Sequence, residues 1–561
     1  MARMKFLCDA DRCIDCNACV TACKNENEVP WGINRRRVVT INDGKPGERS
    51  VSMACMHCTD PPCAAVCPVN CIFPTDDGIV LHSKDLCIGC GYCFYACPFG
   101  APQYPSVGNF GSRGKMDKCT YCAGGGGPDA PGSIEEYRKY GSDRFAQGKL
   151  PMCAEMCSTK SLLAGDGEII AQIYKERVLK RGYGSGAWGW LTAYREDIAA
   201  QTAMRIALQK ALLEARCGRM AMGKCLEGVR NIIFAWTVLV AVFLAMPAAA
   251  EQFAPDGAPN PQASVVNEQT LLQQAPRIQG RIDIPDTRES VLVQPAGRKW
   301  VYFHEVLLHW FGAIVIPGMI VALGAAYLIL GRIPISAGRS GQKVRRFNAF
   351  ERFSHWLTAV SFVILGLTGL NITFGKILVM PMTGHEAFGD LSEAAKYTHN
   401  FVGFSFTIGL ILIVAIWIKD NIPNKVDIEW VKQGGGFIKS KHAPAGRFNA
   451  GEKLVFWFAL VAGVAVVASG FMLLFPFYLT NIAGMQIAQV VHAVVAVLFV
   501  AVILAHIYIA TLGMEGAFEA MGTGEVDLNW ASEHHDQWLR SQLAQQKPAG
   551  RSGGPTATPA E

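Results

Sequence analysis

Charge and cysteine are both missing from long parts of this 561-residue chain. Only two of its 20 cysteines lie after residue 157. The charged fraction is 17%, below the about 25% that is typical of soluble domains. The long runs without Asp, Glu, Lys or Arg lie almost wholly after residue 230. This distribution excludes a single soluble domain of even composition, and it predicts a cysteine-rich part and an apolar part that face different surroundings.

A nucleotide-binding loop is also lacking. The stretch "GGGGPDAPG" at 124–132 has no Gly-Lys-Ser/Thr after it, and "GSGAWG" at 184–189 follows a charged stretch and not an apolar strand. We therefore expect two loops here, and no nucleic-acid partner. The basic run from Arg35 to Arg37 is expected to form a solvated turn.

Sixteen of the cysteines fall into four groups with related spacing. Two groups follow C-x2-C-x2-C-x3-C, one has a wider middle gap, and one is split by a long insertion. The groups are Cys13, Cys16, Cys19 and Cys23; Cys55, Cys58, Cys63 and Cys67; Cys87, Cys90, Cys93 and Cys97; and Cys119, Cys122, Cys153 and Cys157. Three closely spaced thiolates bind three corners of one [4Fe-4S] cube, and the fourth ligates a neighbouring cluster. The spacing predicts four [4Fe-4S] clusters.

We predict that the groups exchange their last cysteines in nested pairs. Cys97 would join Cys55, Cys58 and Cys63; Cys67 would join Cys87, Cys90 and Cys93; Cys157 would join Cys13, Cys16 and Cys19; and Cys23 would join Cys119, Cys122 and Cys153. Structural zinc and disulfides are the alternatives. Zinc sites use C-x2-C pairs and do not need a third cysteine two residues further on. A disulfide framework suits a short secreted domain and not a set of C-x2-C-x2-C loops. The cysteines outside the pattern are not expected to be ligands: Cys8, Cys71, Cys217 and Cys225.

Six apolar runs follow, and each has about the ~20 residues that a helix needs to cross a bilayer. They lie near 232–250, 306–331, 355–375, 397–418, 454–480 and 485–514. The first run resembles a secretory signal that ends in a cleavage site near Ala250. The sequence therefore leaves open whether residues 1–219 and 220–561 are one natural polypeptide. The loops at 331–353 and 419–447 are rich in Lys and Arg, which predicts that they face the cytoplasm.

Four histidines lie at two depths of these runs. His492 and His506 are fourteen residues apart on the last run, about 21 Å of helix rise and almost the same face. Ionisable rings in a bilayer are costly and are usually kept for a task. We predict that His399 and His492 bind an outer haem b, and that His355 and His506 bind an inner one. Two further histidines have no obvious partner and are expected to be structural: His304 and His309.

A short internal repeat supports the bundle. The stretches "RRFNAFERFSHW" at 345–356 and "GRFNAGEKLVFW" at 446–457 both begin a run at its cytoplasmic side. The second copy lacks the histidine, so its end of the bundle is open to another ligand near the inner haem.

These motifs resemble one family. The cysteine-rich part, with "CIDCNACVTACKNENEVPWG" and "CMHCTDPPCAAVCP", resembles the β subunit of membrane-bound formate dehydrogenase, a four-cluster ferredoxin-type protein. The apolar part resembles the γ subunit of that complex, a four-helix dihaem cytochrome b, through "FSHWLTAV", "YTHNFVG", "VVHAVVAV", "LAHIYIAT" and "FNAGEKLVFW". Residues 220–330 have no counterpart in the minimal four-helix subunit.

The resemblance implies a multidomain chain, with an α+β double ferredoxin-like iron–sulfur domain followed by an all-α transmembrane helix bundle. The expected segments are a four-cluster domain at 1–180, a helical tail at 181–219, a signal-like or transmembrane segment at 220–250, a linker at 251–300, an additional transmembrane helix at 301–331, a four-helix dihaem cytochrome b domain at 345–520, and a C-terminal tail at 521–561, disordered in its last part.

The resemblance also implies a function. A separate molybdenum or tungsten subunit would oxidise formate, and electrons would pass through four clusters and two b haems to membrane quinone. Asn449, Gly451 and Glu452 would form the quinone site beside His506, with Glu452 helping to deliver protons. The chain is expected to cross a bacterial inner membrane several times, in contact with lipid. The whole complex is expected to form a higher oligomer.

The side of the membrane is less simple. In the family the cluster domain faces the periplasm, which is the expectation here. If residues 232–250 spanned the bilayer, the positive-inside rule would place residues 1–220 in the cytoplasm instead. Two rival functions also remain: the same wiring serving another molybdopterin oxidoreductase or a [NiFe] hydrogenase, and a non-catalytic membrane anchor whose histidines only pack.

Overall fold

The computed structural model describes residues 3–105, 114–125, 133–181, 278–283, 291–293, 296–435 and 443–546. The apolar run predicted near 232–250 lies outside these residues, as do Cys217 and Cys225. The chain divides into two compact units. One unit holds Met1–Asp43, Arg49–Gly167 and Arg277–Glu561, and the other holds Gly44–Glu48 and Glu168–Pro276. The cysteine-rich part and the apolar helices thus lie in the same unit.

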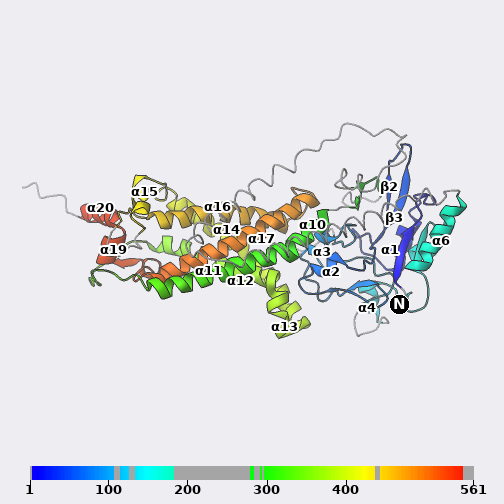
Figure 1. Ribbon diagram of the computed structural model, residues 1–561, viewed down its shortest axis with the longest axis horizontal. Helices are drawn as coiled ribbons and strands as arrows, with labels where there is room; N and C mark the ends of the chain where they lie inside the picture. The colour runs from blue at the N-terminus through cyan, green and yellow to red at the C-terminus, as the bar shows by residue number, and fades with distance from the viewer. Residues whose placement is uncertain are drawn as a thin grey trace, which may run out of the picture. The chain divides into compact units, whose positions relative to one another are not determined.

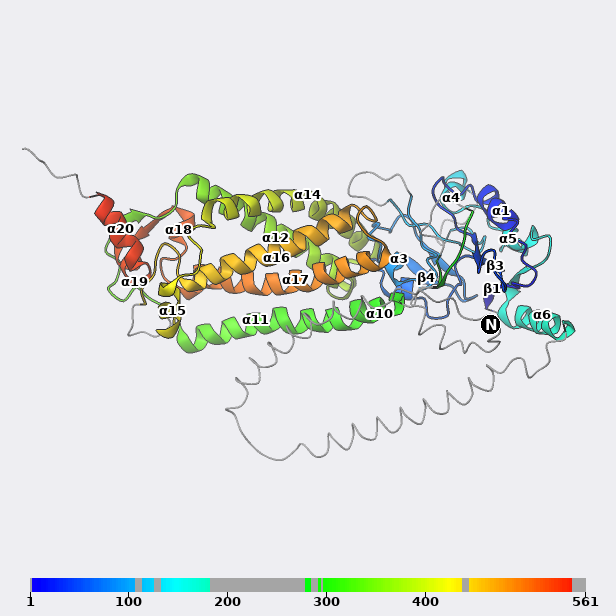
Figure 2. The same cartoon turned by 90° about the horizontal axis from the view of Figure 1, so that it is seen from above.

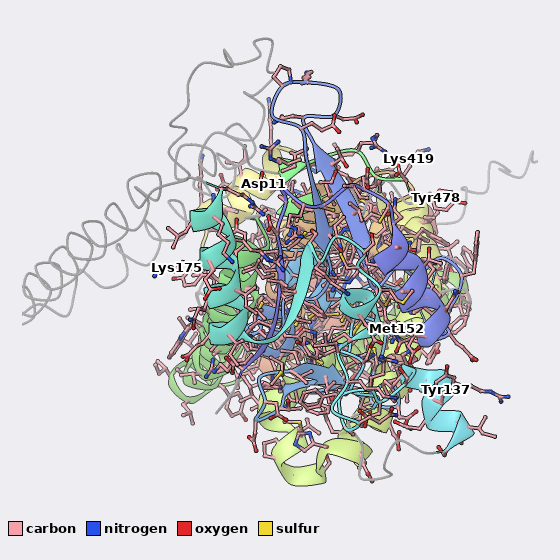
Figure 3. The ribbon with its side chains drawn as sticks, turned by 90° about the vertical axis from the view of Figure 1, so that its right-hand side faces the viewer. Asp11, Tyr137, Met152, Lys175, Lys419 and Tyr478 are labelled. Carbon is pink, nitrogen blue, oxygen red and sulfur yellow. The ribbon has the colours of Figure 1, made fainter. Side chains whose placement is uncertain are left out.

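The cysteine-rich part is made of antiparallel strand pairs and short helices. The pairs are β1 (Met4–Cys8) with β6 (Leu162–Asp166), β2 (Arg37–Ile41) with β3 (Arg49–Met53), and β4 (Ile72–Pro74) with β5 (Val80–His82). The helices are α1 (Ala18–Glu26), α2 (Pro62–Ala65), α3 (Tyr92–Ala96), α4 (Ile134–Tyr140) and α5 (Met152–Glu155). Figure 3 shows Met152 at the start of α5, whose residues Cys153 and Ala154 share a buried core with Cys19 and Val20 of α1. The other unit contributes most of α6 (Gly167–Lys180).

In two of the cysteine groups, a residue with left-handed backbone joins the loop to the helix that follows it. Asn17 (φ 55°) precedes α1 and Gly91 (φ 89°) precedes α3. Gly and Asn are the residues that adopt this conformation most readily. Each lies directly after the second cysteine of its group, so the third cysteine falls in the first turn of the helix that follows.

The apolar part contains five helices, among the described residues, that are long and apolar enough to cross a membrane. They are α11 (Leu308–Leu330), α12 (Ala349–Leu378), α14 (His385–Trp417), α16 (Ala450–Leu474) and α17 (Ile482–Tyr508). α10 (Ala296–Tyr302) continues into α11 through a π-helical turn, Phe303–Leu307, and a second such turn, Ile509–Gly513, extends α17. Figures 1 and 2 both show the five long helices running side by side. Five of the six predicted spans are therefore present.

Short elements connect or precede these helices, and those that follow α17 cover the end of the bundle where α12 and α16 begin. α13 (Met380–Thr383) joins α12 to α14, and α15 (Lys425–Lys432) precedes α16. β9 (Lys343–Arg345) pairs antiparallel with β10 (Glu525–Asp527), and β7 (Ile278–Gln279) with β8 (Val291–Val293). α18 (Glu519–Gly522), α19 (Leu528–His534) and α20 (Asp536–Gln546) follow α17. Trp530 and Trp538 from α19 and α20 share a buried core with Trp417. The tail predicted to be disordered falls on residues beyond 546, outside the described part.

The repeated sequence motif forms two equivalent helix starts. Asn348 caps α12 in a capping box with Glu351, and Asn449 caps α16 in the same way with Glu452. In each box the asparagine side chain accepts a hydrogen bond from the glutamate N–H, and the glutamate accepts one from the asparagine N–H. Both boxes satisfy backbone donors that a helix leaves unpaired at its first turn.

The two copies of the motif are also linked crosswise. Arg346 from the first copy pairs with Glu452 of the second at 2.9 Å, and Arg447 from the second pairs with Glu351 of the first at 2.6 Å. Arg346 and Glu351 are almost fully buried. The exchange fixes the starts of α12 and α16 against each other.

Buried charge also organises the cysteine-rich part. Asp117 is fully buried and forms salt bridges with Arg35 at 2.8 Å and with Lys84 at 3.0 Å. Burial alone would raise the pKa of Asp117, but the charges of Arg35 and Lys84 outweigh it and lower the pKa to about 2. Arg35, Arg36 and Arg37 are all buried, with 3%, 2% and 1% exposed. The expectation of a solvated basic turn was therefore wrong. Arg35 pairs with the buried Asp117, and Arg37 Nη2 donates to the carbonyl oxygen of Phe99.

We expect Asp117→Asn to destabilise the cysteine-rich part by about 3–5 kcal/mol, because it leaves Arg35 buried without its partner. Asp85→Asn is the control, since Asp85 pairs with Lys139 at 3.0 Å but is 71% exposed, and such a pair contributes about 0–1 kcal/mol. The unfolding temperatures of the two variants and the wild type are measured by circular dichroism.

The wild-type chain should also lose the Asp117 contribution as pH falls from about 4, the ordinary pKa, towards about 2. The stabilisation is present above the unfolded-state pKa because the folded-state pKa is the lower one. Equal unfolding temperatures for the two variants would contradict this account.

Candidate cofactor sites

The second cysteine group meets the last cysteine of the third. Cys55, Cys58, Cys63 and Cys97 line one small cavity, with Pro61 and Pro62 beside them. Cys63 lies on α2, and Cys97 follows the last residue of α3. These are the four residues that the nested arrangement predicted for one cluster.

The complementary set lies in the adjoining core. Cys67, Cys87 and Cys93 share one buried cluster, and Cys90 packs against it. Cys71 lies in the same core although it was predicted to be a bystander. Its Sγ lies 3.4 Å from that of Cys67, and its N–H donates to Cys67 Sγ at 3.3 Å. The only sequence signal for this contact is its position four residues after Cys67.

The outer two groups also lie together, because Cys153 of the fourth group shares a buried core with Cys19 of the first. Cys13 and Cys157 pack against the core that contains Cys19. The remaining set is indicated by the surroundings of Cys23, whose pKa is raised by burial and then by the charges of Cys153, Cys119 and Cys122. Asn27 Nδ2 lies 3.9 Å from Cys23 Sγ and 3.7 Å from Cys122 Sγ.

Arg36 lies among these thiols, and sequence reasoning missed it. Burial alone would lower its pKa, but the charges of Cys153, Cys19, Cys119 and Cys23 raise it. A buried guanidinium beside these cysteines fits an anionic iron–sulfur cluster better than a neutral core. Among the described residues, no three His, Cys, Asp or Glu side chains could hold a single metal ion. Judged by its chemistry, the donor set is four thiols per site, the set that [4Fe-4S] clusters use.

Two pairs of histidines face each other in the helix bundle. The ring centres of His399 on α14 and His492 on α17 are 6.1 Å apart, and those of His355 on α12 and His506 on α17 are 6.3 Å apart. A metal bonded to a nitrogen of each ring at about 2 Å would hold the ring centres about 6 Å apart. Both pairs therefore fit two-imidazole ligation of one iron, in the combinations that the sequence predicted.

Hydroxyl side chains orient the outer pair. His399 Nδ1 lies 2.9 Å from Thr368 Oγ1, and His492 Nδ1 lies 3.1 Å from Ser469 Oγ. His492 Nδ1 also donates to the carbonyl oxygen of Val466 at 3.1 Å. Such hydrogen bonds fix the tautomer and ring direction of a metal ligand. They leave Nε2 of each ring as the atom that would ligate a metal.

Two glycines make room beside the same pair. A Cβ on Gly369 would lie 3.4 Å from His399 Cε1, and one on Gly470 would lie 3.3 Å from His492 Cε1. Both line a cavity of about 660 Å³ that contains the two histidines, within the about 300–1,000 Å³ usual for cofactor sites. Its other walls are mainly aliphatic and aromatic. The residues fit a haem, which needs two imidazoles and an apolar slot.

The cysteine-rich part closes one side of this cavity. Gly89, Cys90 and Tyr92 line it together with His399 and His492. Two buried glutamines of α17 hold the contact: Gln486 Nε2 donates to the carbonyl oxygen of Tyr95 at 2.9 Å, and Gln489 Nε2 donates to Tyr92 Oη at 3.0 Å. The third cysteine group therefore adjoins the outer histidine pair.

The remaining predicted residues have structural contacts. His304 is buried, stacks on Trp300 with ring centres 4.9 Å apart, and meets Tyr92 at 4.7 Å. His309 Nδ1 donates to the carbonyl oxygen of His304 at 2.8 Å. These contacts pack both rings, and a structural role for them stays a prediction.

The three residues expected at the quinone site lie at the start of α16. Asn449 and Glu452 form its capping box. A Cβ on Gly451 would lie 3.2 Å from Trp430 Cη2. His535 Nε2 lies 3.8 Å from Glu452 Oε2, and Arg346, just before α12, pairs with the same carboxylate at 2.9 Å. His355 lies near the start of α12. The group is therefore on the side of the inner histidine pair.

Comparison with known proteins agrees with both parts. Residues 49–125 match the family model of the 4Fe-4S dicluster domain, and residues 346–524 match that of the prokaryotic cytochrome b561. A formate dehydrogenase iron-sulfur subunit of Wolinella succinogenes is 60% identical over 198 residues, which are 35% of this chain and 98% of the relative. The cytochrome b556(fdo) subunit of an Escherichia coli formate dehydrogenase is 31% identical over 199 residues, which are 35% of this chain and 91% of the relative.

A third relative has a different named reaction. One subunit of the Escherichia coli anaerobic dimethyl sulfoxide reductase is 33% identical over 168 residues, which are 28% of this chain and 70% of the relative. The fold, the donor sets and these matches define an electron-transfer protein of a membrane oxidoreductase, with iron–sulfur clusters in its α+β part and haem b in its all-α part. This protein belongs to the formate dehydrogenase iron–sulfur subunit family in its N-terminal part and to the formate dehydrogenase cytochrome b subunit family in its C-terminal part. The predicted resemblance and fold class are confirmed.

We expect His399→Ala to remove about half of the b-type haem absorbance of the purified protein, because only the outer pair loses a ligand. His385→Ala is the control, since His385 lies on the same helix but is exposed. Pyridine haemochrome analysis measures the haem content. Full haem content in His399→Ala would show that this histidine only packs.

Proposed function

We propose that this chain carries electrons from formate, oxidised on a separate molybdenum or tungsten subunit, through four [4Fe-4S] clusters and two b haems to membrane quinone. The observation that carries the proposal is one cavity lined both by Cys90, a cluster ligand candidate, and by the histidine pair His399 and His492. A continuous electron path needs the last cluster to adjoin the first haem. The relatives named as formate dehydrogenase subunits favour formate as the electron source.

The clusters and haems supply one-electron carriers when they are bound. The cysteine groups hold them in a row, since the first and fourth groups share a region, the second and third share another, and the third adjoins the helices. Arg36 balances thiolate charge in the outermost region. Gln486 and Gln489 keep the third group against α17, which carries both His492 and His506.

The cluster domain is proposed to face the periplasm of a bacterial inner membrane. The Lys- and Arg-rich loops at 331–353 and 419–447 adjoin the starts of α12 and α16, where His355 and the capping boxes lie. The cysteine-rich part contacts α17 near its start, at Gln486 and Gln489. Since basic loops favour the cytoplasm, this part would lie outside.

Quinone is proposed to bind at the inner end, beside Asn449, Gly451 and Glu452. Glu452 is held by Arg346 and has His535 nearby. A carboxylate and an imidazole next to each other provide a route for the protons that quinone takes up. Gly451 lets the Trp430 ring approach closely, since a Cβ there would lie 3.2 Å from Trp430 Cη2.

A second kind of partner is favoured by the match to the dimethyl sulfoxide reductase subunit, whose complex by its name takes up electrons to reduce its substrate. In that case the same clusters and haems would serve another molybdopterin oxidoreductase. A [NiFe] hydrogenase partner is the further alternative. The catalytic subunit that co-purifies with this protein separates these possibilities.

We expect formate to reduce the haems of the purified complex, seen as b-type bands in a formate-reduced minus oxidised difference spectrum. Metal analysis should give about sixteen cluster irons, four for each [4Fe-4S] cluster, together with haem iron and molybdenum or tungsten. Reduction by dithionite but not by formate would keep the electron path and reject formate as its source.

The repeat supplies a matched test of the quinone site. We expect Asn449→Ser to weaken binding of a quinone-site inhibitor by about tenfold, the effect of one lost hydrogen bond of about 1 kcal/mol or slightly more. Serine keeps the helix cap, and the cap uses only the asparagine Oδ1. Asn348→Ser at the equivalent cap should change nothing. For each variant, the rate of haem reoxidation by quinone is measured at increasing inhibitor concentration. Equal inhibitor affinities in the two variants would mean that the asparagines serve only as caps.

A further inference from the structure

The segment just before the first membrane helix lies along the cysteine-rich part. Arg281 and Thr40 exchange two backbone hydrogen bonds, each of 2.9 Å, in an antiparallel bridge. Thr40 lies in β2, whose other side already pairs with β3. Residues 278–283 therefore add a strand-like edge to this pair, as in β-strand addition. The approach is close: a Cβ on Gly280 would lie 2.2 Å from the carbonyl oxygen of Thr40.

The side chains of this segment contact the loop of the first cysteine group. Arg281 Nη2 lies 2.7 Å from Asp15 Oδ2, and Arg281 Nε lies 2.9 Å from Asp43 Oδ1. Asn17 Nδ2 donates to Asp283 Oδ2 at 3.1 Å. Asp15 lies between Cys13 and Cys16, and Asn17 lies between Cys16 and Cys19.

This loop combines left-handed backbone with an exposed cysteine. Asp15 and Asn17 both have left-handed backbones, with φ of 54° and 55°. Cys16 is the one exposed cysteine among those that the structure describes. Within the cysteine-rich part, Asp15 is bonded by Thr40 Oγ1 at 2.9 Å, and Thr40 is also the residue that bridges to Arg281. The same few residues thus join the loop, the edge strand and the segment before the membrane.

We propose that residues 278–283 form an arm by which the membrane part fastens the loop of Cys13, Cys16 and Cys19. In the sequence, the arm follows the signal-like run and its predicted cleavage site near Ala250, and so stays joined to the membrane helices. It would therefore hold the loop equally when the chain is continuous and when it is severed near Ala250. The arm's contact with the loop stands by itself, and its protection of a cluster rests on the proposed function.

The test is trypsin cleavage after Arg12, which is exposed and directly precedes Cys13. In Arg281→Glu, the new carboxylate would lie next to those of Asp15, Asp43 and Asp283, and the four negative charges would repel one another. We expect the peptide beginning at Cys13 to form several-fold faster in the purified full-length complex, as measured by mass spectrometry. Salt of 1 M or more should accelerate cleavage of the wild type, because exposed ion pairs are screened. Wild-type cleavage rates in Arg281→Glu would overturn the proposal.

Arg339→Glu is the matched control. Arg339 is also an exposed arginine that joins two carboxylates, Glu515 at 3.2 Å and Glu519 at 2.7 Å, but it does so beyond the bundle and not at a cysteine loop. Cleavage after Arg12 should be unchanged in it, and faster cleavage there would also overturn the proposal. The charge exchange Asp15→Arg with Arg281→Asp should restore most of the protection, and no recovery would count against the Asp15 contact.

Iron chemistry separates the arm from the proposed function. We expect a chelator with a mild oxidant to bleach the iron–sulfur absorbance several-fold faster in Arg281→Glu, with the haem spectrum unchanged as the internal standard. Faster trypsin cleavage in a protein without iron at this loop would keep the arm and reject the four-cluster proposal. Faster bleaching without faster cleavage would reject the arm as the fastening of the loop.

Discussion

The electron path of this protein depends on two glutamine side chains buried where an apolar helix meets a polar domain. A free amide in a membrane helix is costly, since no water is present to bond it. Gln486 and Gln489 satisfy theirs on Tyr95 and Tyr92, and so bring the third cysteine group to the wall of the cavity that holds His399 and His492. Lys396, which donates to the carbonyl oxygen of Ile88 at 2.6 Å, and the core of Tyr92, Tyr95, Trp300 and Met485 strengthen the same junction.

The other end of the bundle uses charge for the same purpose. The two copies of the repeated motif exchange arginines, so that each capping glutamate is paired with the arginine of the other copy. This arrangement fixes α12 and α16 where His355 begins its helix and where quinone is proposed to bind. α17 then spans the distance between the two ends and carries one histidine of each pair. Rigid spacing of the two histidine pairs follows from the helix geometry itself.

Glycine and hydroxyl residues adapt the outer pair to its ligand. Gly369 and Gly470 leave the space that the ring faces need, while Thr368 and Ser469 hold Nδ1 of each histidine. These four residues are ordinary members of apolar helices when they are read in sequence. Their role exists only because α12 brings Thr368 and Gly369 to His399 and α16 brings Ser469 and Gly470 to His492. The buried arginines near Cys23 were missed for a related reason, since a basic run carries no mark of the thiolates that fold around it.

The sequence alone determined the elements that depend on local spacing. The rhythm of the cysteine groups, the length of the apolar runs and the two depths of the histidines each follow from the geometry of a loop, a bilayer or a helix. The predicted partners His399 with His492 and His355 with His506 came from depth alone, and the facing rings agree with them. Only the tertiary structure decided which residues support these ligands: Arg36 among the thiols, the glutamines at the junction, the glycines beside the rings, and Arg281 at the first loop. Those contacts join residues tens to hundreds of positions apart, and no local spacing encodes them, because they arise only when separate elements pack together.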